Sequence, residues 1–309
     1  MKMECRRIEF MGVAAYELTT DLVKMVIVEQ CGPRIAFFGF VGDDNILLWE
    51  PGKYTRGEWD LRGGHRVWAA GMGADENEST YAPDNCVCRV QFVGDAIRIT
   101  GAKCPLTNTE RGIQVRALTS GIFEVQNFVT NVGDMLYAGG IWALTCTVPS
   151  MDCVYAIPIG DTSPWNTTTM VLFDRWAGHG HAGFSDPQVK VTNTYVHVTP
   201  AGLETKRMVQ SRLGIIAMVD RGAGFTFVKR AKYNPAGQYP GGCNTAFYVG
   251  PANFMVEMET MGPQSVMRTD ETVVLTEQWA LTPDVSEAFY QNYAGPHTNV
   301  TDIFAGLPD

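Results

Sequence analysis

The segment Ile122-Phe123-Glu124-Val125-Gln126-Asn127-Phe128-Val129 alternates apolar and polar residues through most of its length. Successive side chains of a β-strand point to opposite faces, so this pattern predicts a strand with one face against a core. Short apolar runs bounded by turn signals recur along most of the chain. We expect strands at residues 22–28, 34–40, 87–93, 96–100, 121–130, 141–148, 189–199, 214–220, 225–229, 245–249, 254–259 and 272–281.

Helical patterns are scarce in this sequence. Residues 284–293 alone suggest a helix, with Asp284 or Ser286 as its cap. Many consecutive strands with so little helix predict an all-β, antiparallel fold of stacked sheets or a barrel. The sequence contains no composition break, linker or repeat of about 20–50 residues. We therefore expect a single domain over residues 1–309, too large for an immunoglobulin-type sandwich and built from two large sheets.

Composition excludes several classes of protein. Hydrophobic residues make up 45% of the chain and charged residues 18%, which favours a sizeable core over disorder. The net charge of -9 and the absence of a basic stripe argue against a nucleic-acid partner. No apolar run is long enough to span a bilayer, so we expect no membrane partner. The sequence does not determine the oligomeric state.

Eight cysteines are scattered through apolar segments, and no apolar stretch follows the charged N-terminal residues. This pattern predicts a cytoplasmic protein with free, buried thiols. Cys86-Val87-Cys88 has too short a spacing for the usual zinc motif, so we interpret it as packing and expect no cofactor.

Three long segments rich in aromatic and charged residues are expected to be loops: residues 49–74, which are also rich in glycine, 157–186 and 233–244. Loops of this length inside a compact domain are usually functional. The second contains His179-Gly180-His181, whose two imidazoles would point the same way on an extended chain. Asp174 or Asp186 would complete a metal site, but no third ligand has a characteristic spacing, so we expect no metal and a flexible glycine-rich loop.

Two segments carry groups that suit a sugar. In Phe254-Met255-Val256-Glu257-Met258-Glu259, strand geometry places Glu257 and Glu259 on one face. The segment Gly63-Gly64-His65-Arg66-Val67-Trp68 supplies an imidazole, a guanidinium and an indole. A carboxylate can act as a base, an arginine can hold oxygen atoms, and a flat aromatic ring can stack on a pyranose.

Each of these groups also has a purely structural interpretation. Glu257 and Glu259 could face solvent or pair with Arg34 or Lys206, and Trp68 could belong to the core. His65 and Arg66 could brace a loop through a hydrogen bond and a salt bridge. As neighbours on a strand they would point oppositely, so one of them is expected to have only this bracing role. Arg34 lies in an apolar strand and needs a partner, either Glu259 or another carboxylate.

Six short motifs resemble, in their order along the chain, an uncharacterised family of galactose-mutarotase-like proteins. They are Gly32-Pro33-Arg34-Ile35, Gly63-Gly64-His65-Arg66-Val67-Trp68, Trp142-Ala143-Leu144-Thr145, Tyr239-Pro240-Gly241 with Asn244, Glu257-Met258-Glu259-Thr260 and Glu277-Gln278-Trp279. The resemblance covers nearly the whole chain. It implies a β-supersandwich fold with a sugar-facing cleft, a fold that epimerases, polysaccharide lyases and glycoside hydrolases share.

The resemblance also implies roles for particular residues. Aldose epimerases use a late glutamate on a strand, shortly before a proline, as the general base, and Glu259 with Pro263 matches that position. Their acid is a mid-chain histidine, where this chain has Trp142. The acid's part would then fall to His65 or His179.

We therefore expect a carbohydrate-active protein, most simply an epimerase or mutarotase acting on a sugar or sugar acid. Lyase or hydrolase action on an oligosaccharide and carbohydrate binding without catalysis are the alternatives. In this prediction Glu259 is the base and His65 the acid. The expected substrate contacts are Arg66, Trp68, Arg34, His179, Lys206, Tyr239 and Glu257.

Overall fold

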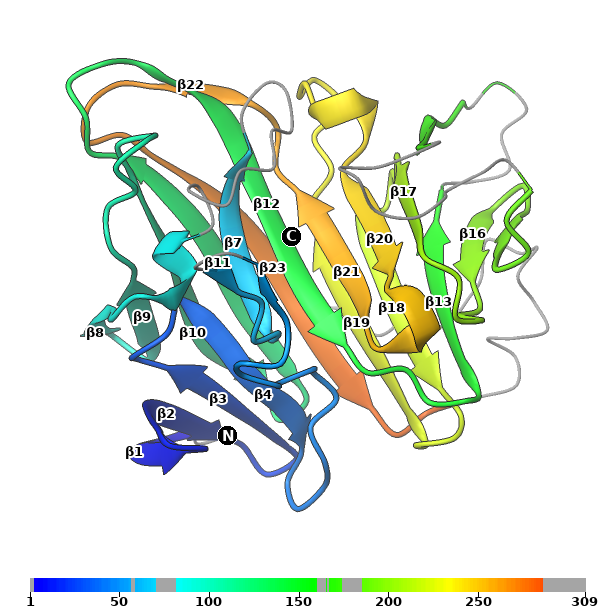
Figure 1. Cartoon of the computed structure of the whole chain (residues 1–309), viewed down its shortest axis with the longest axis horizontal. Helices are drawn as coiled ribbons and strands as arrows, with labels where there is room; N and C mark the ends of the chain where they lie inside the picture. The colour runs from blue at the N-terminus through cyan, green and yellow to red at the C-terminus, as the bar shows by residue number, and fades with distance from the viewer. Residues whose placement is uncertain are drawn as a thin grey trace. The chain divides into compact units, whose positions relative to one another are not determined.

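The computed structural model describes residues 3–56, 59–70, 82–159, 165, 167–173 and 185–285. Their regular structure is almost entirely β-strand, arranged in two large antiparallel sheets and a two-stranded ribbon (Figure 1). The described residues contain no α-helix, only the short 3-10 turns η1 (Ala82–Asn85), η2 (Pro240–Gly242) and η3 (Pro251–Asn253). The predicted all-β, antiparallel fold is confirmed. The helix expected at residues 284–293 lies, from residue 286 onward, outside the described residues.

The chain forms two compact units. Unit 1 contains Met1–Thr147, Gln238–Pro240 and Met261–Glu277; unit 2 contains Val148–Gly237, Gly241–Thr260 and Gln278–Asp309. The expectation of a single domain stays a prediction.

Unit 1 contributes strands to both large sheets. In the first sheet the order is β1 (Glu4–Phe10), β2 (Val13–Thr19), β3 (Val23–Val28), β4 (Arg34–Phe40), β7 (His65–Ala70) and β12 (Tyr137–Thr147), and β22 (Ser265–Met267) also pairs with β12. In the second sheet it is β11 (Ile122–Asn131), β10 (Thr109–Thr119), β9 (Ala96–Thr100) and β8 (Arg89–Val93). The ribbon is β5 (Thr55–Arg56) with β6 (Trp59–Asp60).

Alternation along β11 determines which of its faces is buried. Phe123 and Val125 lie opposite Ala117 and Val115 of β10, and the side chains of Phe123, Val125 and Val115 are fully buried. On the other face the partly exposed pair Arg116 and Glu124 forms a salt bridge of 2.9 Å. Phe38 of β4 meets Phe123 edge-on, with ring centroids 6.0 Å apart, so the core of unit 1 lies between its two layers of strands.

Unit 2 also contributes to both sheets. One group has the order β21 (Val256–Met261), β20 (Thr245–Val249), β17 (Thr205–Val209) and β14 (Met170–Leu172). The other has the order β15 (Val189–Val191), β16 (Tyr195–Val198), β13 (Cys153–Pro158), β18 (Ile215–Asp220) and β19 (Phe225–Ala231). The remaining strand, β23 (Thr272–Thr282), begins in unit 1 and ends in unit 2. Phe227 packs edge-on against Trp279 in this unit, with centroids 5.3 Å apart.

The first predicted loop was wrong in its second half. Residues 65–70 form β7, which lies between β4 and β12 in the first sheet. The glycines that suggested a loop mark the entry into this strand instead. Gly63 has a φ of 92°, and a Cβ there would lie 2.3 Å from the carbonyl oxygen of Leu48. Only glycine therefore fits at that close approach.

The other two loop predictions differ in outcome. The segment 157–186 contains the short strand β14, and several of its residues are outside the described ranges. Residues 233–244 contain no strand and only η2, as predicted. The run at 189–199 is two strands, β15 and β16, separated by a turn in which the Thr192 hydroxyl accepts hydrogen bonds from the backbone N–H groups of Thr194 and Tyr195.

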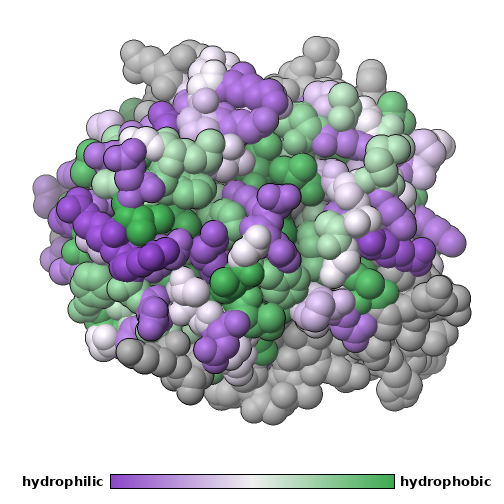
Figure 2. Space-filling view, turned by 90° about the horizontal axis from the view of Figure 1, so that it is seen from below, coloured by the Kyte–Doolittle hydropathy of each residue, from purple (hydrophilic) through white to green (hydrophobic). Residues whose placement is uncertain are grey.

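The surface carries no single large apolar patch on the face seen in Figure 2, where hydrophilic and hydrophobic residues are interspersed. All eight cysteines are free, and most are buried. Among the helical turns that the structure describes, none has the length and apolar character needed to cross a membrane.

Gly112 of β10 tests how tightly side chains pack on the outer face of the second sheet, the face that carries Arg116 and Glu124. The ring of Phe128 lies directly opposite Gly112, and the guanidinium of Arg98 lies 3.8 Å from the centroid of that ring. A Cβ at Gly112 would approach Phe128 Cζ to 1.9 Å. We expect Gly112→Ala to lower the free energy of unfolding by about 1–3 kcal/mol, because the ring must move. Urea titration monitored by circular dichroism measures this.

Gly262→Ala is the matched control, since its Cβ would meet no atom closer than 3.7 Å. Equal unfolding midpoints for the two variants would contradict the packing described here.

His197 of β16 predicts a loss of stability in acid. Burial, assisted by Lys190 directly opposite on β15, lowers the pKa of His197 from 6.5 to about 4. Between these pH values the unfolded chain binds a proton that the folded chain does not, so the free energy of unfolding falls as the pH falls. The expected loss from pH 7 to pH 4 is about 1–3 kcal/mol, with about 3 kcal/mol as the upper limit in the absence of solvent screening. His197→Gln should flatten this part of the stability–pH curve; an unchanged slope would refute the assignment.

Candidate functional site

Strand alternation in β7 separates two residues that the sequence placed together. His65 lies opposite Thr145 of β12, whereas Arg66 lies opposite Leu144 and Trp68 opposite Trp142. Directly opposed residues of an antiparallel pair share a face, so His65 is on one face of the sheet, and Arg66 and Trp68 are on the other. This confirms that the neighbours His65 and Arg66 point oppositely.

His65 belongs to a fully buried polar network in unit 1. Its Nδ1 is 2.9 Å from the hydroxyl of Thr145, and its Nε2 is 2.8 Å from Oδ1 of Asn127. Asn127 in turn donates its amide N–H to Glu277 at 3.0 Å, and that carboxylate lies 3.8 Å from His65 Nε2. Since the Asn127 amide donates to Glu277, its carbonyl oxygen accepts from His65, whose Nε2 must carry the proton.

This environment fits the bracing role better than the catalytic one. The His65 side chain has no exposed surface, and both of its ring nitrogens contact side chains of the unit 1 interior. A catalytic acid must turn a proton toward the atom that it protonates, and the contacts of both ring nitrogens inside unit 1 weigh against this role for His65. The assignment of His65 as the acid stays a prediction.

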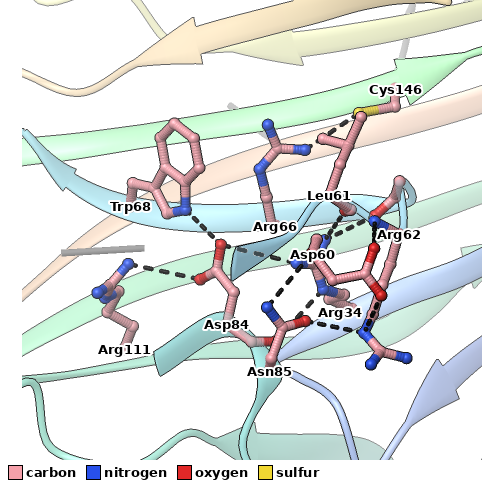
Figure 3. Close-up of polar contacts among 11 residues, drawn as sticks. Arg34, Asp60, Leu61, Arg62, Arg66, Trp68, Asp84, Asn85, Arg111 and Cys146 are labelled. Atoms are coloured by element: carbon pink, nitrogen blue, oxygen red, sulfur yellow. Dashed lines mark hydrogen bonds and ion pairs between the residues drawn. The ribbon is translucent and has the colours of Figure 1, made fainter. Parts of the chain in front are cut away.

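Arg66 and Trp68 form a cation–aromatic cluster on the opposite face of β7. The Arg66 guanidinium lies 4.5 Å from the Trp68 ring centroid and 5.7 Å from that of Trp59. Its Nη1 also donates to the sulfur of Cys146 at 3.1 Å (Figure 3). Trp142 meets Trp68 edge-on at 5.7 Å. The aromatic rings thus hold the guanidinium plane in a defined orientation.

Asp84 of η1 is the anion around which this cluster is organised (Figure 3). It accepts hydrogen bonds from the indole N–H of Trp68 and, at 3.5 Å, from Arg111, and it lies 3.8 Å from Nη2 of Arg34. Arg34 also donates to the carbonyl oxygens of Leu61 and Gly63 at 3.1 and 2.8 Å. Burial lowers the pKa of the Arg34 guanidinium, and the nearby Asp84 opposes that effect.

The partner expected for Arg34 is therefore another carboxylate, Asp84, which the sequence did not single out. Asp84 is 1% exposed, although it lies in a short turn. The signal that could have found it is the presence of buried arginines on strands, each of which requires a nearby acid. Backbone carbonyls and this carboxylate enclose the Arg34 guanidinium, an arrangement that fits a brace; the substrate contact expected of Arg34 stays a prediction.

Unit 2 contains the glutamate that the sequence proposed as a base. Glu259 of β21 is fully buried, and its Oε1 accepts a hydrogen bond from the ammonium of Lys206 on β17. Glu257 lies opposite Tyr248 of β20, and Tyr248 lies opposite Lys206. Because Glu257 and Glu259 are two residues apart on one strand, all four side chains belong to one face. The pairing of Glu259 with Lys206 is one of the structural alternatives that the sequence left open.

The other predicted residues are placed less fully. Tyr239 is buried in unit 1 directly before η2. His179 and His181 lie outside the described residues. Within the described ranges, no three His, Cys, Asp or Glu side chains are arranged to hold a metal ion. The candidates thus fall into two groups, Arg34, His65, Arg66, Trp68 and Tyr239 in unit 1 and Lys206, Glu257 and Glu259 in unit 2; that all of them line one sugar site stays a prediction.

Comparison with solved structures identifies the fold. A candidate aldose 1-epimerase from Escherichia coli K12 superimposes with a TM-score of 0.61 at 12% identity, over 88% of this chain and 99% of that one. A galactose mutarotase-like protein from Lactobacillus casei ATCC 334 gives 0.60 at 11% identity, over 90% and 100%. Another from Clostridium acetobutylicum gives 0.56 at 8% identity, over 91% and 98%.

The chain therefore has the galactose mutarotase-like fold, as its motifs suggested. No protein-family model matches the chain, and no curated protein matches its sequence. At these low identities the likeness concerns the fold, and the chemistry has to be argued from the residues of this chain.

The Lys206–Glu259 contact predicts that losing Lys206 alone destabilises the protein more than losing both charges. Lys206→Met would leave the Glu259 carboxylate without its ammonium partner in a buried position, and we expect a loss of about 3–5 kcal/mol in the free energy of unfolding. Adding Glu259→Gln removes the uncompensated charge, so the double variant should recover part of that stability. Chemical denaturation of Lys206→Met, Glu259→Gln, the double variant and the parent gives the coupling energy between the two side chains. Additive losses would show that the two groups do not interact.

Proposed function

We propose that this chain is a saccharide epimerase of the aldose 1-epimerase type, in which Glu259 acts as the general base. The observation that carries the proposal is the buried Glu259 carboxylate in contact with the Lys206 ammonium on a strand face shared with Glu257. The galactose mutarotase-like fold supports a saccharide as the ligand.

Exchange of anomers requires removal of a proton from the C1 hydroxyl and delivery of another proton to the ring oxygen. The bond between C1 and the ring oxygen then breaks, the aldehyde rotates, and the ring closes on the other face. In this proposal Glu259 removes the first proton, and Lys206 holds the carboxylate in orientation and favours its ionised form. Fixing the base before substrate arrives reduces the entropic cost of the step.

Two neighbouring residues of one face of β7 are proposed substrate contacts. Arg66 and Trp68 share one face of β7. In this proposal the Arg66 guanidinium binds oxygen atoms of the sugar, and the Trp68 ring packs against an apolar face of the sugar ring. Tyr239 and Glu257 stay proposed contacts, and His179 stays a proposed contact and candidate acid. His65 stays a candidate acid and Arg34 a candidate contact, and the hydrogen bonds that both make inside unit 1 support a bracing role as the alternative.

A second function, binding of a carbohydrate without turnover, is favoured by one observation. At the mid-chain position where aldose epimerases carry their acid, Trp142 packs edge-on against Trp68. A protein that lacks an acid would retain affinity for sugars but catalyse no exchange of anomers.

The test of the proposed function follows the equilibration of freshly dissolved α-D-glucose and α-D-galactose by polarimetry or NMR. The parent protein should accelerate equilibration, and Glu259→Gln should lower the rate by about 100- to 10,000-fold, the usual contribution of a positioned base. Glu110→Gln is the control, since it changes a strand glutamate that pairs with Arg89 near the surface. It should leave the rate unchanged.

Three results would redirect the assignment. Equal rates for Glu259→Gln and the parent would refute the role of Glu259. Binding of sugars, measured by thermal shift, without any acceleration would favour the non-catalytic function. A product absorbing in the ultraviolet from an oligosaccharide would indicate a lyase.

A further inference from the structure

Tyr248 occupies the centre of the strand face that carries the proposed base. Its strand, β20, lies between β17 and β21, and Tyr248 is directly opposite Lys206 on one side and Glu257 on the other. Directly opposite side chains have Cβ atoms about 5 Å apart, and diagonal neighbours are roughly 7–8 Å apart. Glu259 is such a diagonal neighbour, within reach of a group as long as a tyrosine.

The phenol of Tyr248 is held in one orientation. Its hydroxyl donates a hydrogen bond of 2.5 Å to Oε1 of Glu204, the residue directly before β17. The Tyr248 side chain is 7% exposed, so burial and this hydrogen bond together restrict its rotation. The single phenol hydrogen points to Glu204 on the face shared with Glu259 and Lys206, so it turns from Glu204 to a bound sugar before it is donated.

We propose that Tyr248 is the catalytic acid of this site and delivers a proton to the ring oxygen of the sugar. This inference rests on the proposed function and supplies the group that the chain lacks at its mid-chain position, where Trp142 is found. The C1 hydroxyl oxygen and the ring oxygen are bonded to the same carbon. Base and acid must therefore be near neighbours on one face, as Glu259 and Tyr248 are.

The proton transfers balance without a further reactant. As Glu259 takes the proton of the C1 hydroxyl, the Tyr248 hydroxyl gives its proton to the ring oxygen, and the bond between C1 and that oxygen breaks. The products are an open-chain aldehyde with a free hydroxyl, a protonated Glu259 and a phenolate at Tyr248. Ring closure reverses each transfer: the hydroxyl attacks the aldehyde carbon and returns its proton to Tyr248, while Glu259 protonates the carbonyl oxygen.

Lys206 makes this exchange of charge electrostatically feasible. During ring opening the negative charge moves from Glu259 to Tyr248. The Lys206 ammonium contacts Glu259, and the Lys206 side chain stands directly opposite Tyr248. The Lys206 ammonium is therefore near the negative charge both when it is on Glu259 and when it is on Tyr248. The site does not have to reorganise during ring opening. Glu204 orients the phenol but disfavours the phenolate, because like charges repel.

The experiment compares Tyr248→Phe with Tyr16→Phe in the equilibration assay, using α-D-glucose and α-D-galactose. Tyr16→Phe removes the hydroxyl from a partly exposed ring of unit 1 that packs on Phe92, and should leave the rate unchanged. Tyr248→Phe should lower kcat by about 100-fold or more while KM stays within about threefold, because the acid acts in the transition state rather than in binding.

A second variant tests the role with the phenol still present. Glu204→Gln retains a hydrogen-bond acceptor for Tyr248 and removes the negative charge beside it. The phenolate then becomes easier to form, so the alkaline limb of the kcat profile, where the acid has lost its proton, should move to lower pH. A tyrosine with only a structural role would leave this limb in place.

The outcomes separate the two proposals. Suppose that Glu259→Gln loses activity. If Tyr248→Phe then keeps its full kcat, or if the alkaline limb of Glu204→Gln does not move, the role of Tyr248 is overturned and the proposed function stands. Absence of any acceleration by the parent protein would overturn both.

Discussion

The alternation of side chains along a strand places each candidate residue that lies on a strand of this protein. In β7 this alternation puts His65 into the interior network with Thr145, Asn127 and Glu277 and puts Arg66 on the opposite face. A slip of one residue in register would exchange these environments, placing a guanidinium in the network and an imidazole among the tryptophans. The close approach of Gly63 to the Leu48 carbonyl fixes the chain just before the strand begins.

Buried charge is the second constraint, and each unit meets it locally. In unit 1 the carboxylate of Asp84 neighbours the guanidinium groups of Arg34 and Arg111. In unit 2 Glu259 and Lys206 meet across β20, from residues 53 positions apart in sequence. Such pairs add little net stability compared with apolar residues, but removing one partner is costly. Their positions are therefore fixed by the fold, and the same contact holds the Glu259 carboxylate in one orientation.

The sequence predicted strands well where alternation or apolar runs were strong. The limits expected for residues 34–40, 96–100 and 245–249 coincide with β4, β9 and β20. The strands that it missed include β1, β2, β10, β13 and β17. Charged residues interrupt the apolar pattern of β1 and β10, because β1 lies at the edge of its sheet and β10 has a polar outer face. Strand β7 was missed because glycine was interpreted as a sign of a loop.

For the site, the sequence identified individual groups and left their partners open, with Lys206 as one of two cations named for the glutamates. The shared face of Glu257 and Glu259 follows from a period of two and could be predicted. The positions of Lys206 and Tyr248 beside them depend on the pairing of β17 with β20 and of β20 with β21, which spacing along the chain does not specify. Asp84 escaped notice for a related reason, since a turn residue gains its partners only after distant strands have paired.

The tryptophan at position 142 links the fold to the chemistry. It faces Trp68 across the β7–β12 pair, and Trp68 in turn stacks against Arg66 and donates to Asp84. An imidazole at this position would be smaller and would lose the edge-on contact that supports the whole cluster. In the proposed reaction the acid therefore comes from another strand, and β20 pairs directly with β21, the strand of Glu259. Tyr248 on β20 meets that requirement through register alone, independently of β12.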